Sequence, residues 1–314
     1  MVLLRYDGAN LWNFGPTAVK TEEENNAMSY TIMSDTACDI SPAIAKEWGV
    51  DLVSMTFRFE KEEREYGNAD MPIGEFYGKI KNGAIAKTAA INPEKFTEAF
   101  EEVLKSGSDL LYLGFSSGLS TTYNSAVMAA NELREKYPER KIITVDTLCG
   151  SAGQGLLLYL AVQKKKGGAT IEETAEYVEE NKLNLCHWFT VDDLVYLKRG
   201  GRISPTLAFV GNILGIKPVL HVDNEGHLVN VLKARGRKKA LDTIIEKYGE
   251  LALCKNEGTV FISHAVCESD VEYFKNKVAE TYGINVDLVT DIGPVIGAHS
   301  GPGTFAFFFL GKER

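Results

Sequence analysis

The chain has 314 residues, 45% of them hydrophobic, which is long enough for about two globular domains with substantial cores. Its 34 lysine and arginine residues against 43 aspartate and glutamate residues give a net charge of -9, which argues against a broad electrostatic attraction to nucleic acid or to an anionic membrane. No apolar stretch approaches the roughly 20 residues that a membrane-spanning helix needs, so we expect no such helix.

The five cysteines, Cys38, Cys149, Cys186, Cys254 and Cys267, are odd in number and widely spaced. They form neither a CxxC ligand pattern nor a dense disulfide framework, so we expect reduced thiols in a cytoplasmic protein. The N-terminus lacks a charged region followed by a sustained apolar core, and therefore does not resemble a secretory signal. Residues before Met28 show neither helical nor strand periodicity, which is typical of a disordered N-terminal extension over residues 1–27.

The first regular elements are predicted just after this extension. Residues 30–33 form a short apolar strand, and residues 34–36, Ser-Asp-Thr, place oxygen-bearing side chains at its end. Ser41 then favours the start of a helix because its hydroxyl can accept from free backbone amides, and Pro42 suits the first helical position. Gly49 can end this helix.

Strands and helices continue to alternate along the first half of the chain. The predicted elements are a strand over 51–57, a helix from Pro93 to about Lys105, a strand over 109–115, a helix over 119–136 and a strand over 141–146. This alternation predicts a parallel α/β sheet. Ligands of such sheets bind outside the carboxyl ends of the strands, where residues 34–36, Ser116, Ser117 and residues 146–147 all fall.

The second half of the chain has a mixed pattern. A long helix near Gly153 and a charged stretch after it mark a transition, so we divide the chain into an α/β domain over residues 28–169 and a mixed α+β domain over residues 170–314. Strands over 217–222 and 228–232 flank the turn-like residues 223–226 and predict a β-hairpin, and strands over 259–264 and 285–290 enclose a helix over 269–282.

The stretch TVDDLVYLKRGGRIS, residues 190–204, combines cations with a glycine pair. We interpret its lysine and arginine at 198–199 as the exposed end of a helix that Gly200 caps. Gly200 and Gly201 permit a close approach or a positive φ that bulkier residues resist. Arg202 is therefore presented from a turn, where it either reaches a ligand or remains solvated.

Residues 114–118, GFSSG, fit the G-x-S-x-G pattern of a hydrolase nucleophile elbow between a strand and a helix. A serine hydrolase is thus an alternative, with Ser116 as nucleophile, Asp192 or Asp291 as the acid and His299 as the base. The sequence has no HGGG-like oxyanion loop, which favours hydrogen bonding by the two serines over hydrolysis.

A third class, a phosphate-binding α/β module, is suggested by the glycine-rich residues 150–155 after a strand. Their order is not G-x-G-x-x-G and no Walker lysine follows, which favours close packing at a helix start. His187, His221, His227 and His264 have no ligand-like spacing with cysteine or acidic residues. We therefore expect neither a metal ion nor a nucleotide cofactor.

Several collinear segments together resemble the DegV family. Besides residues 190–204 they are SDTACDI (34–40), FSSGLSTTYNSA (115–126), KPVLHVDNEGHL (217–228), KARGRKKAL (233–241) and IGPVIGAHSGPGT (292–304). Together the matches are much more specific than any single one. The family that they resemble binds one long-chain fatty acid between two α/β domains, which implies a parallel-sheet N-terminal domain, a mixed C-terminal domain and a lipid site between them.

The resemblance also implies a head-group site. Thr88 matches the threonine of the family's hydroxyl-rich loop, Ser116 and Ser117 match its paired serines, and His299 matches the histidine before Gly-Pro-Gly. These four residues would bind the fatty-acid carboxylate. Arg202 matches the family's arginine after Gly-Gly and would face a phosphate or a partner protein, because a guanidinium suits phosphate oxygens.

The chain departs from the family's pattern at Ala89, where a second hydroxyl is usual, and at Thr121, where glycine is usual. One apolar stretch is predicted to line the tail tunnel, with an ordinary core role as the alternative: Phe209, Val210, Ile213, Leu214 and Ile216. In bacteria, members of the family present the acid to a separate ATP-dependent kinase. The resemblance thus implies a non-catalytic subunit of a fatty acid kinase, with a bound fatty acid and no cofactor.

Overall fold

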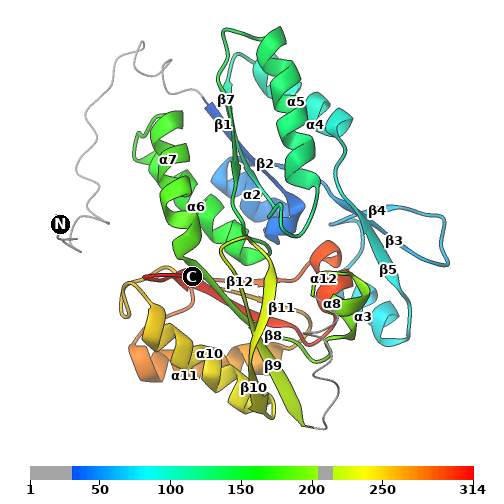
Figure 1. The fold of residues 1–314 in the computed structure, drawn as a ribbon, viewed down its shortest axis with the longest axis vertical. Coiled ribbons are helices and arrows are strands. Elements are labelled where there is room, and N and C mark those ends of the chain that lie inside the picture. The colour runs from blue at the N-terminus through cyan, green and yellow to red at the C-terminus, as the bar shows by residue number, and fades with distance from the viewer. Residues whose placement is uncertain (1–29, 204–214) are drawn as a thin grey trace.

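A computed structural model describes residues 30–203 and 215–314. The predicted N-terminal extension lies outside these ranges, as do four residues predicted to line the tail tunnel: Phe209, Val210, Ile213 and Leu214. Within the described residues the chain forms a four-stranded, a three-stranded and a six-stranded sheet. Figure 1 shows the four-stranded sheet in one half of the molecule and the six-stranded sheet in the other.

The four-stranded sheet is parallel, as the sequence predicts, with the order β2-β1-β6-β7. Its strands are β1 (Tyr30–Asp35), β2 (Val50–Val53), β6 (Asp109–Gly114) and β7 (Ile142–Asp146). Helices α4 (Pro93–Lys105) and α5 (Thr122–Lys136) cover one face, and α2 (Pro42–Trp48), α6 (Ala152–Lys166) and α7 (Ile171–Asn181) cover the other. Leu110 and Tyr112 pack with the first pair of helices, whereas Leu111 and Leu113 pack with α6, because successive side chains of a strand point to opposite faces.

The predicted local signals at helix α2 are confirmed. The Ser41 hydroxyl accepts a hydrogen bond from the backbone N–H of Ile44 at 3.3 Å, and Pro42 occupies the first turn. Gly49 ends the helix with φ +70°, a conformation that favours glycine. The helix therefore has the bounds that its sequence signals indicate.

The predicted single strand over 51–57 is wrong, because the chain turns between two sheets there. β2 ends at Val53, and β3 (Thr56–Phe59) belongs to a separate antiparallel sheet. At the break, the backbone N–H of Met55 donates to the Thr36 hydroxyl at 3.0 Å instead of continuing a ladder. The other elements around this sheet are β4 (Tyr66–Gly67), β5 (Ala86–Ala89) and helix α3 (Ile73–Lys81).

The six-stranded sheet is mixed, with the order β10-β9-β8-β13-β11-β12. Its strands are β8 (Leu185–Thr190), β9 (Ile216–Val222), β10 (Leu228–Arg235), β11 (Phe261–His264), β12 (Leu288–Asp291) and β13 (Phe305–Leu310). Only the β11–β12 pair among these is parallel. Helices α10 (Arg237–Leu251) and α11 (Glu268–Tyr282) cover the outer face, where Phe305, Phe307 and Phe309 are buried. The hairpin predicted around residues 223–226 is confirmed as β9–β10.

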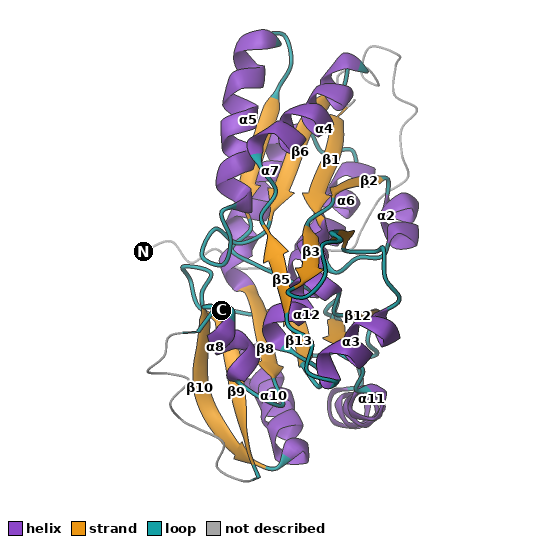
Figure 2. Ribbon diagram, turned by 90° about the vertical axis from the view of Figure 1, so that its right-hand side faces the viewer, coloured by secondary structure: helices purple, strands orange, loops and turns teal. Residues whose placement is uncertain are grey.

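Helix α6 packs between the parallel and the mixed sheet, and Figure 2 shows the two sheets from the side. Residues 152–158 of α6 are all buried, because the helix has a sheet on each side. One core cluster accordingly joins Leu111 of β6 through Leu157 to Phe308 of β13.

The chain crosses from one sheet to the other after α7. This helix begins just beyond the predicted division at residue 169, but it packs on β6 and β7 of the parallel sheet. A short 3₁₀ helix, η3 (Lys182–Asn184), follows before β8 starts the mixed sheet at Leu185. The position of the domain boundary stays a prediction. No helix in residues 30–203 or 215–314 is long and apolar enough to cross a membrane.

Candidate functional site

A cavity of about 360 Å³ lies between the carboxyl ends of the parallel strands and the inner face of the mixed sheet. Its apolar lining consists of Met55, Ala90, Phe115, Leu119, Phe189, Leu197, Val222, Leu228, Ile292, Val295, Ile296, Ala306 and Phe308. Its polar side chains are Thr88, Ser117, Ser120, Thr121, Ser151, His187, Arg202, His299, Ser300 and Thr304. Both halves of the chain thus contribute to one mostly apolar space.

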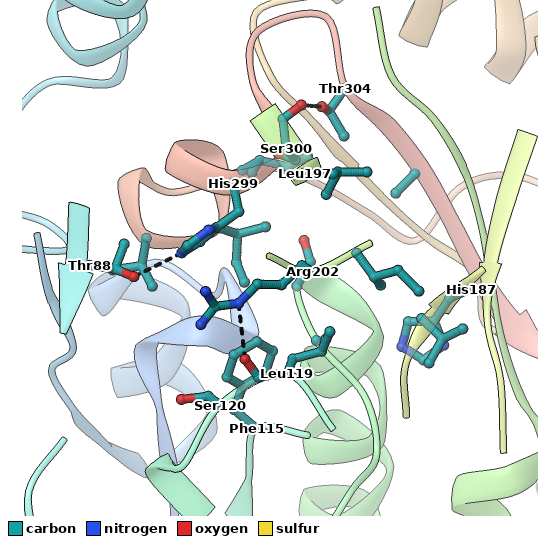
Figure 3. Close-up of a pocket in the computed structure, with 18 of the residues that line it drawn as sticks. Thr88, Phe115, Leu119, Ser120, His187, Leu197, Arg202, His299, Ser300 and Thr304 are labelled. Carbon is teal, nitrogen blue, oxygen red and sulfur yellow. Dashed lines mark hydrogen bonds between the residues drawn. The ribbon is translucent and has the colours of Figure 1, made fainter. Parts of the chain in front are cut away.

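The predicted residues Thr88 and His299 form a hydrogen-bonded pair at one side of this cavity. The Thr88 hydroxyl on β5 lies 2.8 Å from Nε2 of His299 on the short helix α12 (Pro294–Ser300), as Figure 3 shows. Burial, and next the positive charge of Arg202, lower the pKa of His299 to about 4. The imidazole is therefore neutral near pH 7 and offers a polar group without adding a charge.

Arg202 reaches into the cavity between α12 and the loop after β6, as Figure 3 shows. Its Nε donates to the carbonyl oxygen of Leu119 at 3.1 Å, and its Nη1 donates to the carbonyl oxygen of Gly200. Burial lowers its pKa, and no carboxylate among the described residues opposes that effect. A half-buried guanidinium of this kind is a suitable partner for an anionic ligand.

The sequence predicts a close approach or a positive φ at the Gly-Gly pair, and each of these properties occurs at a different glycine. Helix α8 (Val195–Arg199) ends at Gly200, as predicted, and a Cβ on Gly200 would overlap Nδ1 of His299. Gly201 has φ +69°, the left-handed conformation that turns the chain toward Arg202. Close approach at one glycine and positive φ at the next thus bring Arg202 beside His299.

Two glycines after His299 also allow a close approach between segments. A Cβ on Gly301 would overlap the ring of Tyr196 on α8, and a Cβ on Gly303 would overlap the carboxylate of Asp192. The segments that contain α8 and α12 therefore pack through three glycines, of which Gly200 lies on one segment and Gly301 and Gly303 lie on the other. This packing explains why two glycine-rich motifs far apart in the sequence occupy the same site.

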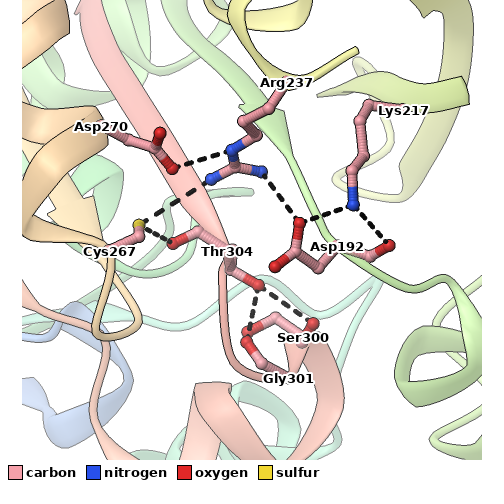
Figure 4. A network of polar contacts seen from close by, with 8 residues as sticks. All are labelled: Asp192, Lys217, Arg237, Cys267, Asp270, Ser300, Gly301 and Thr304. Carbon is pink, nitrogen blue, oxygen red and sulfur yellow. Dashed lines mark hydrogen bonds and ion pairs between the residues drawn. The ribbon is translucent and has the colours of Figure 1, made fainter. Parts of the chain in front are cut away.

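An ion network holds Asp192 in this position, as Figure 4 shows. Its Oδ1 lies 2.7 Å from Nζ of Lys217 on β9 and 3.8 Å from Nη1 of Arg237 at the start of α10. Nε of Arg237 in turn donates to Oδ2 of Asp270 on α11 at 2.8 Å. The network anchors the segment before α8 to the outer helices of the mixed sheet.

The paired serines of the GFSSG loop have different surroundings. Ser117 lines the cavity, and its backbone N–H donates to Oδ1 of Asp146 at 3.2 Å. Ser116 is buried outside the lining, where its hydroxyl donates to the carbonyl oxygen of Gly226 at 2.9 Å and accepts from the N–H of Gly118 at 3.2 Å. Ser116 thus joins the loop to the turn of the β9–β10 hairpin, and its role as a ligand residue stays a prediction.

These contacts do not support the serine hydrolase alternative. The hydroxyl of Ser116 is bonded to Gly226, while Nε2 of His299 is bonded to Thr88, so the described contacts contain no serine–histidine pair. A nucleophile elbow needs its serine within hydrogen-bond reach of the base. The glycine-rich residues 150–155 also have the packing role that their sequence favours, since α6 starts among them.

The predicted convergence of strand ends is confirmed by hydrogen bonds. Oδ2 of Asp35, at the end of β1, accepts from the Tyr112 hydroxyl at 2.7 Å and from the N–H of Phe115 at 2.9 Å. Asp146, at the end of β7, accepts from Ser117 and from the N–H of Leu148. Both aspartates therefore shape the loops beside the cavity rather than contacting its interior.

Sequence reasoning missed several polar residues that line the cavity. One is Ser151, whose hydroxyl donates to Oδ2 of Asp39 at 2.5 Å. Oδ1 of Asp39 accepts from the N–H of Gly293 at 2.9 Å, next to α12. Burial raises the pKa of Asp39 to about 8. Ser120, Ser300 and Thr304 were also missed, because single hydroxyl residues carry no recognisable spacing.

Three further findings concern the departures from the family's pattern, the predicted tunnel lining and metal binding. Thr121, which replaces the glycine usual in the family, lines the cavity, whereas Ala89 does not. Ile216, predicted to line the tail tunnel, begins β9 and does not line the cavity. Across residues 30–203 and 215–314, no group of three or more His, Cys, Asp or Glu side chains is placed to hold a metal ion.

Comparisons with known proteins identify the family of this chain. The family model described as "Uncharacterised protein, DegV family" matches residues 29–312. A DegV domain-containing protein of Clostridium perfringens is 43% identical over 286 residues, which cover 91% of this chain and 98% of that protein. A crystal structure of a DegV lipid-binding protein from Thermotoga maritima has a TM-score of 0.79 and 31% identity, covering 91% of this chain and 99% of its own. A structure from Thermus thermophilus, described as fatty acid binding of a DegV family protein, has a TM-score of 0.81 and 29% identity, covering 90% and 99%. By its sequence and by its fold, this chain belongs to the DegV family.

Proposed function

We propose that the cavity binds one long-chain fatty acid. The observation that supports this proposal most strongly is the distribution of its side chains: an apolar space of about 360 Å³ has Thr88, His299 and Arg202 together at one side. Pockets for small molecules commonly measure roughly 300–1,000 Å³ and combine apolar walls with a few convergent polar groups. The lipid-binding and fatty-acid-binding descriptions of the two similar structures support the same ligand class.

The carboxylate would lie beside Thr88, Ser117 and His299, with Arg202 supplying the positive charge. Neutral hydroxyls and an imidazole can donate to an anion, and a cation beside them strengthens the hold. Arg202 is half-buried, so pairing with a carboxylate would also offset the cost of burying its charge. Ser116 is left out of this arrangement because its hydroxyl is bonded to Gly226.

The tail would supply most of the affinity. A saturated tail of about 14 methylenes at ~0.8 kcal/mol each offers on the order of 11 kcal/mol before association costs. One neutral hydrogen bond to the head group contributes only roughly 0.5 to 1.5 kcal/mol. The head-group residues would therefore mainly orient the acid, so that its carboxylate has a fixed position.

We further propose that the protein presents this carboxylate to a separate ATP-dependent fatty acid kinase and is itself not an enzyme. The chain has no recognisable nucleotide motif, so a partner would supply the phosphoryl group. Arg202 lies at the head-group side, and a guanidinium can bind two phosphate oxygens at once. It would thus serve the partner reaction or the acyl-phosphate product.

Native mass spectrometry of the purified protein tests the ligand class. A co-purifying mass of one fatty acid per chain, identified after extraction, is the expected result. Covalent labelling of Ser116 by a fluorophosphonate would instead support a serine hydrolase. Protein that carries no lipid and takes up no added oleic or palmitic acid would refute the proposal.

Phosphotransfer with a fatty acid kinase tests the presentation role. The Arg202→Ala variant loaded with fatty acid should yield much less acyl phosphate than the wild type. Arg199→Ala is the matched control, since Arg199 is an exposed arginine at the end of α8, three residues before Arg202, and does not line the cavity. Equal rates for the Arg202 variant and the wild type would rule out this role, while leaving fatty-acid binding untouched.

A further inference from the structure

The residues on the inner face of the mixed sheet show which end of the cavity lies away from His299. The cavity-lining residues are Thr304, just before β13, Ala306 and Phe308 on β13, and His187 and Phe189 on the paired strand β8. Every second residue faces the cavity, as expected for strands with one face toward it. From Thr304 to Phe308 the strand advances about 13 Å at roughly 3.3–3.4 Å per residue. Thr304 follows α12, which carries His299, so Phe308 marks the far end.

His187 and Phe308 are directly opposite each other in the β8–β13 pair. Their rings are 5.4 Å apart and nearly perpendicular, and both line the cavity. Figure 3 shows His187 on the opposite side of the pocket from Thr88 and His299. These two rings therefore form a wall at the end that lies away from the head-group residues.

One nitrogen of the His187 ring has a hydrogen-bond partner and the other has none among the described residues. Its Nδ1 lies 3.1 Å from the carbonyl oxygen of Leu185 on the same strand, which can only accept, so this nitrogen carries a proton. Burial keeps the pKa of His187 well below its usual value. Nε2 is buried without a hydrogen-bond partner among the described residues. This unpaired acceptor costs stability that an apolar ring would not, so stability does not explain a histidine here.

Gly153 of α6 supports both rings from behind. A Cβ on Gly153 would overlap Nε2 of His187 and would lie 2.6 Å from its Cδ2 and 2.8 Å from Cδ1 of Phe308. The absence of a side chain at Gly153 therefore allows the two rings to withdraw from the cavity. Any larger residue would push them toward its interior, because the backbone of α6 is buried between two sheets and has no room to retreat.

We propose that His187 and Phe308, supported by Gly153, form the stop for the acyl tail and set the longest chain that the cavity admits. This inference rests on the proposed function, since it requires a fatty acid whose carboxylate lies near His299. It identifies specificity-determining residues for chain length, at the end of the cavity away from the head group. Gly153 would thus determine the depth of the cavity without contacting the ligand itself.

Binding of a series of saturated fatty acids, from lauric to arachidic acid, tests this inference by calorimetry on delipidated protein. Gly153→Ala should weaken the longest acid that the wild type binds by more than about tenfold relative to a shorter one, because each excluded methylene costs roughly fourfold in affinity. His187→Ala should shift the preference in the opposite direction, toward longer acids. His221→Ala is the matched control, since His221 lies on the adjacent strand β9 and stacks on Trp188, on the other face of the sheet.

The outcomes separate this inference from the proposed function. If the wild type binds no acid of the series, the proposed function fails and the stop fails with it. If the wild type binds but Gly153→Ala and His187→Ala keep its chain-length profile, only the stop is wrong. A Gly153 variant that does not fold leaves His187→Ala as the deciding measurement, because an unchanged profile in that variant overturns the inference alone.

Discussion

Gly200 lies directly against the imidazole of His299, so that a Cβ at residue 200 would overlap Nδ1. The same imidazole is bonded through Nε2 to Thr88, which lies on β5 of the three-stranded sheet. The glycine therefore helps to position a side chain that is distant in sequence. Its φ is negative, at −72°, so close approach rather than backbone conformation explains the need for glycine.

The Gly200→Ala variant should bind fatty acid more weakly, because the added methyl group displaces His299 from Thr88. Loss of one such hydrogen bond is worth roughly 0.5 to 1.5 kcal/mol, so we expect a decrease of several-fold to about tenfold in affinity. Gly74→Ala, at an exposed position in α3 with open space around it, is the control. Unchanged calorimetric affinity in the Gly200 variant would show that the imidazole does not contribute to binding.

Removal of the Ser117 hydroxyl should weaken binding by only several-fold. Ser117 lines the cavity, but one neutral hydrogen bond is small beside the contribution of the buried tail. Titration calorimetry with Ser117→Ala should therefore give retained binding at lower affinity. Complete loss of binding by a folded variant would contradict this division between tail and head group.

Ser116→Ala should act on stability more than on binding. Its hydroxyl is the described partner of both the Gly226 carbonyl and the Gly118 N–H, and burial prevents water from replacing it easily. We expect a loss of about 1–3 kcal/mol in the free energy of unfolding, measured in urea. A variant with normal stability and no fatty-acid binding would show instead that Ser116 contacts the ligand, as the family resemblance implies.

The depressed pKa of His299 predicts a pH dependence of stability in the ligand-free protein. The folded pKa of about 4 lies below the ordinary value of 6.5, so the unfolded state binds more protons between these values. The contribution of His299 is therefore fully present above pH 6.5 and is lost as the pH falls toward 4. Urea unfolding of wild type and His299→Gln across this range should show a difference that shrinks with decreasing pH. A difference independent of pH would mean that the imidazole is not held neutral.

Much of the parallel-sheet domain could be predicted because the sequence signals that start and end its elements are local. The predicted bounds of α4 (Pro93–Lys105) are those observed, since Asn92 and Pro93 define its start without tertiary contacts. The small antiparallel sheet could not be predicted in the same way. β3 is held by pairing with β5, in which Phe57 opposite Thr88 joins distant residues, and its four residues carry little signal alone.

The candidate site was accessible to sequence reasoning mainly through family resemblance. Thr88, Ser117, Arg202 and His299 all line the cavity, but their local sequence did not indicate how they meet. Helix α12 is an example: its glycine content argues against a helix. In the folded chain Gly297 allows this helix to pack closely on Tyr77, a contact that the local sequence does not show.

The burial of helix α6 between two sheets affects how a bound lipid can be exchanged. Because it is buried against both the parallel and the mixed sheet, swinging the two halves apart would strip it from one of them and expose a largely apolar surface to water. Such a clamshell motion would cost far more than the displacement of a few side chains at the rim. We therefore expect lipid to enter and leave through small local movements of the surrounding loops, while both halves stay joined.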